Sequence, residues 1–312
     1  MHRNRLSELT VITSSPCTSL TSSALRPDTS EAHTTETALD RTDFRADCGR
    51  CFALCCTAFG FSRSADFAED KPAGSPCRHL DSAFGCSIHR ALPSRGFRGC
   101  TVFDCFGAGQ VVSQRLFSGT SWRERPELRD RMFSAFKILK QLHEMLWYLL
   151  EAQERTYDPD TEDEIRELAD FLVSLTRGDV DELLSADMGD VHASVRAVLM
   201  TVSAHVRVSY FADGGRVHPR IAPGADLAGT DLRAYRLCGA DLRGAVLIGA
   251  DLRGCDLAGV DLIGADLRDA RLEDADLSLA LYLTQPQINA ARGNERTRIS
   301  SAVSVPTGWC RE

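Results

Sequence analysis

The sequence lacks the features of a membrane or exported protein. No apolar run approaches the roughly 20 residues of a membrane span, and the N-terminal stretch MHRNRLSELTVITSS has no continuous apolar segment typical of a signal peptide. Acidic side chains outnumber Lys and Arg by 44 to 36, and no basic patch suited to phosphate neutralisation occurs. We therefore expect a cytoplasmic location, no membrane contact and no nucleic-acid partner.

The first 42 residues also lack hydrophobic periodicity. They are rich in Ser, Thr and Glu, which predicts a disordered arm with order beginning near Phe44. The rest of the 312 residues, in a chain that is 43% hydrophobic and 26% charged, is long enough for two domains with their own cores. Twelve cysteines without an export signal indicate metal ligands or reduced thiols rather than disulfides.

Residues 43–111 form a cysteine-rich segment. The spacing in Cys48-Gly-Arg-Cys51 lets both sulfurs face one point, an arrangement suited to zinc or to an iron–sulfur cluster. We predict a metal-binding module for zinc or iron, with one four-ligand centre and spare thiols or with two centres. The candidate ligands are Cys48, Cys51, Cys55, Cys56, Cys77, Cys86, Cys100 and Cys105.

An alternative interpretation is that some of these thiols are small buried hydrophobic side chains rather than ligands. Cys56 is the clearest case, because neighbouring side chains such as those of Cys55 and Cys56 seldom face one ion. His79 and His89 are weaker ligand candidates, since a lone histidine is more often a surface or core residue. The glycines in Gly107-Ala108-Gly109 indicate a plain turn.

The order of the cysteines adds a resemblance. The segments are Cys48-x2-Cys51-x3-Cys55-Cys56, Cys77-Arg-His-Leu80, Cys86-Ser-Ile-His89 and Cys100. This order resembles the bacterial family named for its CxxCxxCC motif, which implies chelation of zinc or iron. The chain departs from that motif by having three residues between Cys51 and Cys55, so the resemblance does not define the ligand set.

Residues 112–211 carry the periodicity of helices. Pro126 is suited to open a long amphipathic helix, and Thr161 with Glu164 matches a capping box for a second helix that ends before Gly178. Residues 180–184 add a short turn, and a third helix begins near Asp190. We expect a helical bundle in which the long first helix packs against the other two. Four of its residues could serve in catalysis or metal binding by their chemistry, but they are not spaced like metal ligands, so we expect them on the solvated surface or in the core: His143, Glu144, His192 and His205.

After a linker at 212–224, residues 225–279 divide without a gap into eleven five-residue units. Leucine is central in every unit, from Leu227 to Leu277, and a small residue mostly stands two positions earlier, Tyr235 being the exception. A period of five fits neither a helix nor a strand, so we predict a coil in which four units complete a turn and leucines stack at intervals of twenty. This pattern resembles the pentapeptide-repeat family, which implies a right-handed quadrilateral β-helix.

Residues 280–312 are expected to cap the coil and end in a tail. Between Leu283 and Gly293 the sequence predicts a short helix with Pro286 in its first turn and Gly293 just past its end. On the coil itself, an aspartate often precedes the leucine and an arginine follows it, as in Asp251 and Arg253. Such residues are suited to ion pairs within a unit or to bonds with nearby backbone.

The combined prediction is a multidomain α plus β-solenoid protein that serves as a metal-binding scaffold. The units contain no nucleophile–base pair, which favours a protein-interaction role without catalysis. We expect another protein as partner and leave the oligomeric state open, with a homodimer as one option. A rival hypothesis is a zinc- or iron–sulfur-dependent redox or modifying enzyme seated in the cysteine-rich module.

The family resemblance brings a third hypothesis, a DNA mimic that binds DNA gyrase. Eleven units make fewer than three turns, so the rod is only ~13 Å long at a strand spacing of about 4.8 Å. The eleven acidic side chains in residues 225–279 are also diluted by six arginines. Length and charge therefore both speak against mimicry of duplex DNA.

Overall fold

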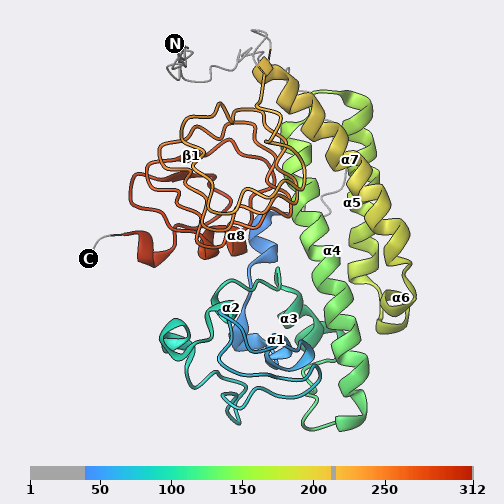
Figure 1. Ribbon diagram of the computed structural model, residues 1–312. Coiled ribbons are helices and arrows are strands. Elements are labelled where there is room, and N and C mark those ends of the chain that lie inside the picture. Colours follow the sequence, from blue (N-terminus) through green and yellow to red (C-terminus); the bar gives the residue numbers. More distant parts are fainter. Residues whose placement is uncertain (1–38, 212–215, 311–312) are drawn as a thin grey trace, which may run out of the picture.

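The computed structural model describes residues 39–211 and 216–310, so the predicted disordered arm lies almost wholly outside the described residues. Figure 1 shows the long helix α4 as a spine, with the cysteine-rich module beside its first half and the coil beside its second half. Helices α5, α6 and α7 cover the other side of this spine. Within the described ranges, every helix is too short or too polar to cross a membrane.

Helix α4 spans Arg129–Arg155 and follows a 3-10 turn at Pro126–Leu128. Apolar residues at steps of three and four bury one face along its whole length. Helices α5 (Pro159–Arg177) and α7 (Met188–Val208) pack on it, and the short α6 (Val180–Ser185) joins them. The predicted packing of the first helix against the other two is confirmed.

The start of α5 differs from the prediction. Asp158 is the N-cap, and its carboxylate accepts hydrogen bonds from the backbone N–H (3.1 Å) and the hydroxyl (2.6 Å) of Thr161. Pro159 occupies the first helical position, where its missing N–H costs nothing. The predicted capping box of Thr161 with Glu164 is therefore wrong, because the helix already begins two residues before Thr161.

The cysteine-rich module consists of short turns and loops. Its regular elements are the 3-10 turns Arg41–Phe44, Cys48–Arg50, His89–Ala91 and Pro93–Arg95, the helices α1 (Leu54–Ala58), α2 (Arg98–Thr101) and α3 (Ala108–Gln110), and a π-helix at Val111–Leu116. Leu54, Phe106 and Val112 are buried in the same cluster as the apolar face of α4. The module therefore shares its core with α4.

The coil has the predicted interior. Backbone bridges join residues twenty positions apart in parallel, as between Asp226 and Val246 or Asp231 and Asp251. All eleven central leucines, from Leu227 to Leu277, are at most 2% exposed. The inward-facing leucine ladder is confirmed, and residues 225–279 form a β-solenoid.

The aspartates that precede the leucines have structural roles at the corners of the coil. The carboxylate of Asp241 accepts a hydrogen bond from the backbone N–H of Arg243 (3.3 Å) and also pairs with its guanidinium (2.6 Å). Most units then turn through a glycine at positive φ, such as Gly254 at 67°. Asp269, at φ 56°, takes this place in a unit without glycine, because aspartate tolerates the left-handed conformation. Both roles predicted for the aspartates, ion pairing and backbone bonding, are therefore observed.

The coil extends beyond the eleven units. Strand β1 (Asp276–Leu277) pairs in parallel with β2 (Arg298–Ile299), and Ile221 in the predicted linker is buried against the first turn. Helix α8 (Gln285–Ala290) has Pro286 in its first turn, as predicted. Gly293 does not end this helix. It lies against the indole of Trp309, where an added Cβ would come within 2.6 Å of the ring.

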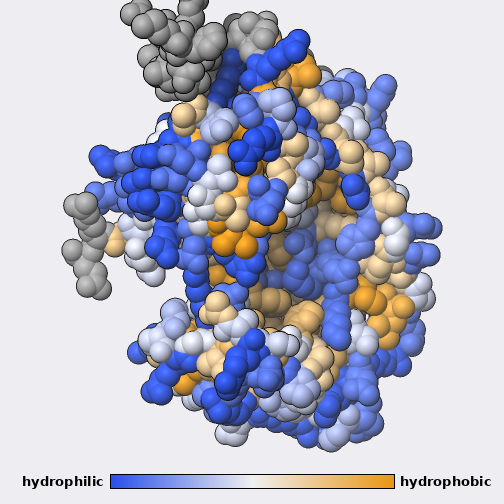
Figure 2. Space-filling view, in the orientation of Figure 1, coloured by the Kyte–Doolittle hydropathy of each residue, from blue (hydrophilic) through white to orange (hydrophobic). Residues whose placement is uncertain are grey.

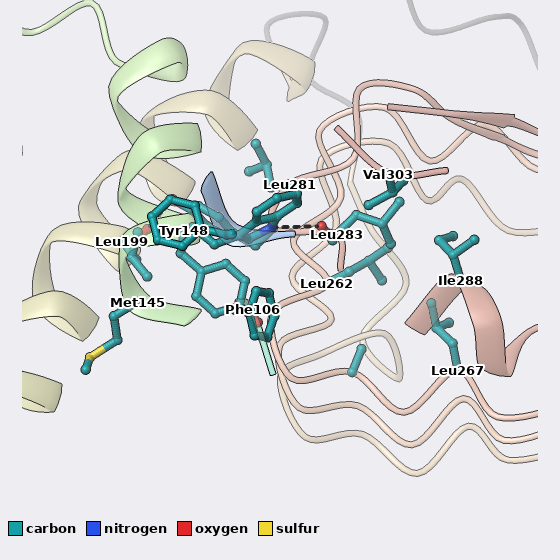
Figure 3. Packing of buried hydrophobic residues seen from close by; sticks show 14 of the residues in the cluster. Phe106, Met145, Tyr148, Leu199, Leu262, Leu267, Leu281, Leu283, Ile288 and Val303 are labelled. Atoms are coloured by element: carbon teal, nitrogen blue, oxygen red, sulfur yellow. Dashed lines mark hydrogen bonds between the residues drawn. The ribbon is translucent and has the colours of Figure 1, made fainter. Parts of the chain in front are cut away.

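Polar contacts join the helices to the coil around a buried tyrosine. The backbone N–H of Tyr282 donates to the carboxylate of Glu151 (2.9 Å), and its hydroxyl donates to the carbonyl of Leu199 (3.1 Å). Figure 3 shows Tyr148 and Leu199 of the helices beside Leu281 and Leu283 of the coil. The last 3-10 turn of the helical layer (Ser209–Phe211) also covers the coil, where Cys238 is buried beneath Tyr210.

Candidate metal centre in the cysteine-rich module

Four stretches of chain bring the eight predicted cysteines into one module. Cys48 and Cys51 frame a 3-10 turn, Cys55 and Cys56 lie on α1, and Cys77 and Cys86 flank a tight loop closed by a bridge between Leu80 and Cys86. Cys100 lies on α2, and Cys105 stands just before α3. All eight are free thiols.

The first group of thiols comprises Cys48, Cys51, Cys55 and Cys105. The Cys51 and Cys105 sulfurs both lie beside Gly109, where an added Cβ would stand 2.7 Å and 3.8 Å from them. Gly109 is thus required by close packing of sulfur, although the sequence predicted only a turn there. Burial, together with the neighbouring Cys105, raises the pKa of the Cys51 thiol to about 11.

The second group comprises Cys56, Cys77, Cys86 and Cys100. The backbone N–H of Cys77 donates to the carbonyl of Cys56 (3.0 Å), which aligns the two segments. Cys100 is close enough to Cys56, Cys77 and Cys86 for each of them to act electrostatically on its thiol. The second group therefore unites three separate segments of the sequence, which carry Cys56, the pair Cys77 and Cys86, and Cys100.

The two groups meet at Cys55 and Cys56, whose sulfurs are 3.8 Å apart. The contact between these thiols raises the pKa of Cys55. The same contact, together with the nearby cation of Lys71, lowers the pKa of Cys56 to about 7. Cys56 was the thiol most readily interpreted as a packing residue from sequence alone. Its environment in the structure instead favours the thiolate, the form that binds metals.

Lys71 is a residue that sequence reasoning missed. Its side chain is only 7% exposed, and its ammonium donates to the backbone carbonyls of Thr57 (3.4 Å), Phe59 and Pro72 (3.3 Å). Burial lowers the pKa of Lys71, and the surrounding thiols, Cys77 and Cys56 foremost, act against that lowering. The sequence around Lys71 gives no indication of this burial.

The two weaker ligand candidates, His79 and His89, make other contacts. His79 packs edge-on against Phe97 (5.1 Å between ring centroids) and contacts the guanidinium of Arg78 (3.3 Å), while His89 is exposed. Between residues 39 and 310, leaving out 212–215, no three Cys, His, Asp or Glu side chains are arranged to hold a metal ion. The donor chemistry of eight gathered thiols fits a soft metal, but their sulfurs do not form a closed coordination shell.

His143 has the core position predicted for it. The ring is buried, and its Nδ1–H donates to the carbonyl of Phe106 (2.6 Å), next to Cys105. Phe44 packs edge-on against it, with ring centroids 5.3 Å apart. Burial lowers the pKa of His143 to about 4, so the ring is neutral near pH 7.

The module also contacts the coil directly. The guanidinium of Arg98 pairs with the Asp269 carboxylate (2.7 Å) and donates to the carbonyl of Ala290 (2.8 Å), while Asn289 donates to the carbonyl of Thr101 (3.2 Å). Figure 2 shows a hollow between module and coil with apolar residues on its floor and hydrophilic residues around it. Helix α2, which carries Cys100, is thereby tied to the capping end of the coil.

A second concave site lies between α4, α7 and the coil. This groove of about 550 Å³ is lined largely by apolar atoms of Met145, Leu199 and Ile263. Its floor includes the Asp261 carboxylate, which is fully buried and accepts a hydrogen bond from the Ser203 hydroxyl (2.5 Å). Because Asp261 is satisfied within the protein, it serves to join helix and coil.

Comparison with known proteins supports the repeat assignment. The family model described as "Pentapeptide repeats" matches residues 224–258 and 240–278. A pentapeptide repeat protein from the Arabidopsis thaliana thylakoid lumen is similar at 29% identity and TM-score 0.19, covering 28% of this chain. Rfr23 of the cyanobacterium Cyanothece 51142, also a pentapeptide repeat protein, is similar at 27% identity and TM-score 0.16, covering 29% of this chain. The matches span only 54% and 49% of those two chains.

A longer similarity covers most of the chain. The "Uncharacterized protein YybG" of Bacillus subtilis (strain 168) is 49% identical over 267 residues, which is 86% of this chain and 95% of YybG. That match includes more than the repeats, because the eleven units occupy only residues 225–279. The chain is therefore a pentapeptide-repeat protein that belongs to the same family as YybG.

Proposed function

We propose that this protein is a metal-binding scaffold without catalysis of its own, in which the cysteine-rich module holds zinc or iron and the repeat coil binds another protein. The observation that carries the proposal is the gathering of eight free thiols from separate segments into one module. Cysteine thiolates are the preferred ligands of zinc and of iron–sulfur clusters. Such a metal would supply a cross-link between loops that lack regular secondary structure.

The separation of the sulfurs is compatible with a site that closes on binding. A preformed thiolate site is costly without its metal, because the sulfurs must lose their protons and then repel one another. The raised pKa of buried Cys51 keeps that thiol protonated until a metal displaces the proton. The candidates that would hold the metal remain Cys48, Cys51, Cys55, Cys56, Cys77, Cys86, Cys100 and Cys105.

The coil supplies the scaffold part of the proposal. The twenty-residue spacing of its bridges supports the right-handed quadrilateral form implied by the family resemblance. The helices cover one side, while ion pairs such as Asp231 with Arg233 (2.7 Å) lie on exposed faces. A rigid surface with both signs of charge suits a protein partner, a second copy included, better than it suits nucleic acid.

The metal content of protein purified without oxygen tests this proposal. We expect at least one equivalent of zinc or iron in the native protein, and the same content in Cys310→Ser, which removes an exposed thiol outside the module. At least one of two double variants, Cys48→Ser with Cys51→Ser or Cys77→Ser with Cys100→Ser, should lose an equivalent. Native protein without metal, or equal content in all four proteins, would contradict the proposal. A cluster that exchanges electrons reversibly would instead favour the enzyme hypothesis.

A further inference from the structure

The groove between α4, α7 and the coil is bounded by an open corner of the coil. Gly244, Gly259 and Gly264 all turn such corners at φ between 64° and 66°. Tyr210 lies directly on one corner, where a Cβ added to Gly259 would come 2.1 Å from its ring. At the next corner, which lines the groove, a Cβ added to Gly244 would meet no described atom within 4 Å, and one added to Gly264 would meet the backbone of Gly244 at 4.0 Å. The helical layer therefore covers one corner with an aromatic ring and leaves its neighbour open.

The walls of this groove are apolar and adaptable. Helix α4 contributes Met145 and Tyr148, and helix α7 contributes Leu199 and Met200. Methionine side chains adjust to ligands of different shape, and Met200 has 40% of its surface exposed. Tyr148 packs edge-on against Tyr282, which also lines the groove, with 5.9 Å between ring centroids. Because rings pack favourably edge-on or offset against other rings, these walls suit an aromatic ligand, and about 550 Å³ is a usual volume for a small-molecule site.

One charged side chain at the groove has no partner in the described part of the chain. The other charged side chains that line it are satisfied within the protein: Glu144 by Lys140 (2.7 Å), Arg243 by Asp241 (2.6 Å) and Asp261 by Ser203 (2.5 Å). Arg196, on the exposed face of α7, forms no hydrogen bond or ion pair with any described residue. A guanidinium matches the planar geometry of a carboxylate, so the charge of the groove favours an anionic ligand.

We propose that this groove binds a small aromatic carboxylate. The ring lies on the corner of Gly244 and Gly264, as Tyr210 lies on the neighbouring corner, and the carboxylate pairs with Arg196. An exposed ion pair contributes little free energy, so the apolar walls supply most of the affinity and Arg196 selects the charge. No cysteine lines the groove, so this site is independent of the metal-binding proposal.

Calorimetric titration of the full chain with 2-naphthoate and with its neutral counterpart 2-naphthamide tests this site. Native protein should bind 2-naphthoate at one site per chain, with a Kd below about 1 mM and at least about threefold more tightly than 2-naphthamide. Arg196→Glu should weaken 2-naphthoate binding at least about fivefold and change 2-naphthamide binding less than about twofold. Arg166→Glu makes the same change at an exposed position on α5 and should leave both affinities within about twofold. Met200→Trp, which fills the groove from α7, should weaken the binding of both compounds.

Several outcomes would overturn the proposal. Native protein that does not bind 2-naphthoate, or that binds 2-naphthamide equally well, has no site for an aromatic carboxylate. Binding of 2-naphthoate that Met200→Trp leaves unchanged would place the ligand elsewhere. If native protein is a dimer in sedimentation and Met200→Trp is a monomer, the groove is an interface between two copies. Thermal unfolding without ligand checks each variant, and Ile263→Trp, which fills the groove from the coil, replaces Met200→Trp if that variant does not fold.

Discussion

Replacement of Leu252 by alanine tests the interior of the coil. Leu252 is 1% exposed, and the leucines twenty residues before and after it, Leu232 and Leu272, are equally buried. The substitution removes three carbon atoms, which at ~0.8 kcal/mol each amounts to about 2.4 kcal/mol of transfer free energy. A residual cavity of about 50 Å³ adds roughly 1 kcal/mol at ~24 cal/mol per Å³. We therefore expect the free energy of unfolding to fall by about 3 to 4 kcal/mol.

The measurement is urea unfolding followed by both circular dichroism and tryptophan fluorescence. Trp309 packs against Gly293 at the capping end of the coil, so part of the fluorescence change reports the repeats. Leu279→Ala is the matched control, because this leucine lies in the last unit with 43% of its surface exposed. The control should cost less than about 1 kcal/mol. A cost below ~0.5 kcal/mol for Leu252→Ala would refute the stacked leucine interior.

Three further predictions concern the core, the module contact and the coil surface. The folded pKa of His143 is about 4 and its unfolded value is near 6.5, so its contribution to the free energy of unfolding is complete above pH 6.5 and is lost as the pH falls towards 4. The loss between pH 7 and pH 5 is about 2 kcal/mol. Denaturation at both pH values should therefore show a smaller drop in stability for His143→Gln than for the native protein. Arg98→Ala, which breaks the 2.7 Å pair with Asp269, should speed hydrogen exchange in α2 and α8, and unchanged exchange would show that the contact does not hold the module to the coil. The protein should not inhibit supercoiling by gyrase, whereas inhibition abolished by Asp251→Lys with Asp256→Lys would identify a DNA mimic.

The repeats were predictable because their evidence is local and repeated. Each unit carries the same leucine and small residue, so eleven copies give one consistent answer without knowledge of distant contacts. The long helix α4 was predictable for the same reason, since its apolar residues recur along seven turns. The start of α5 was not, because Asp158 and Thr161 are both good caps and the choice depended on Pro159 between them.

The sequence indicated which cysteines belong to the module, but not how the fold groups them. Their division into two groups depends on contacts between segments far apart in the chain, such as the hydrogen bond from Cys77 to Cys56. Gly109 gave no local signal, because its role comes from the sulfurs packed around it. Sequence reasoning therefore identified the cysteines of the module but not the way in which the fold groups them.

The shared core changes what a metal would do in this protein. Leu54 of α1 and Phe106 pack against the same apolar cluster as α4, so the chain around the first thiol group is held without a metal. The loop that carries Cys77 and Cys86 has few buried apolar residues and only short turns. A cross-link contributes most where the chain is otherwise least constrained, so a metal in the second group would order this loop. Through Arg98 and α2, that order would extend to the capping end of the coil.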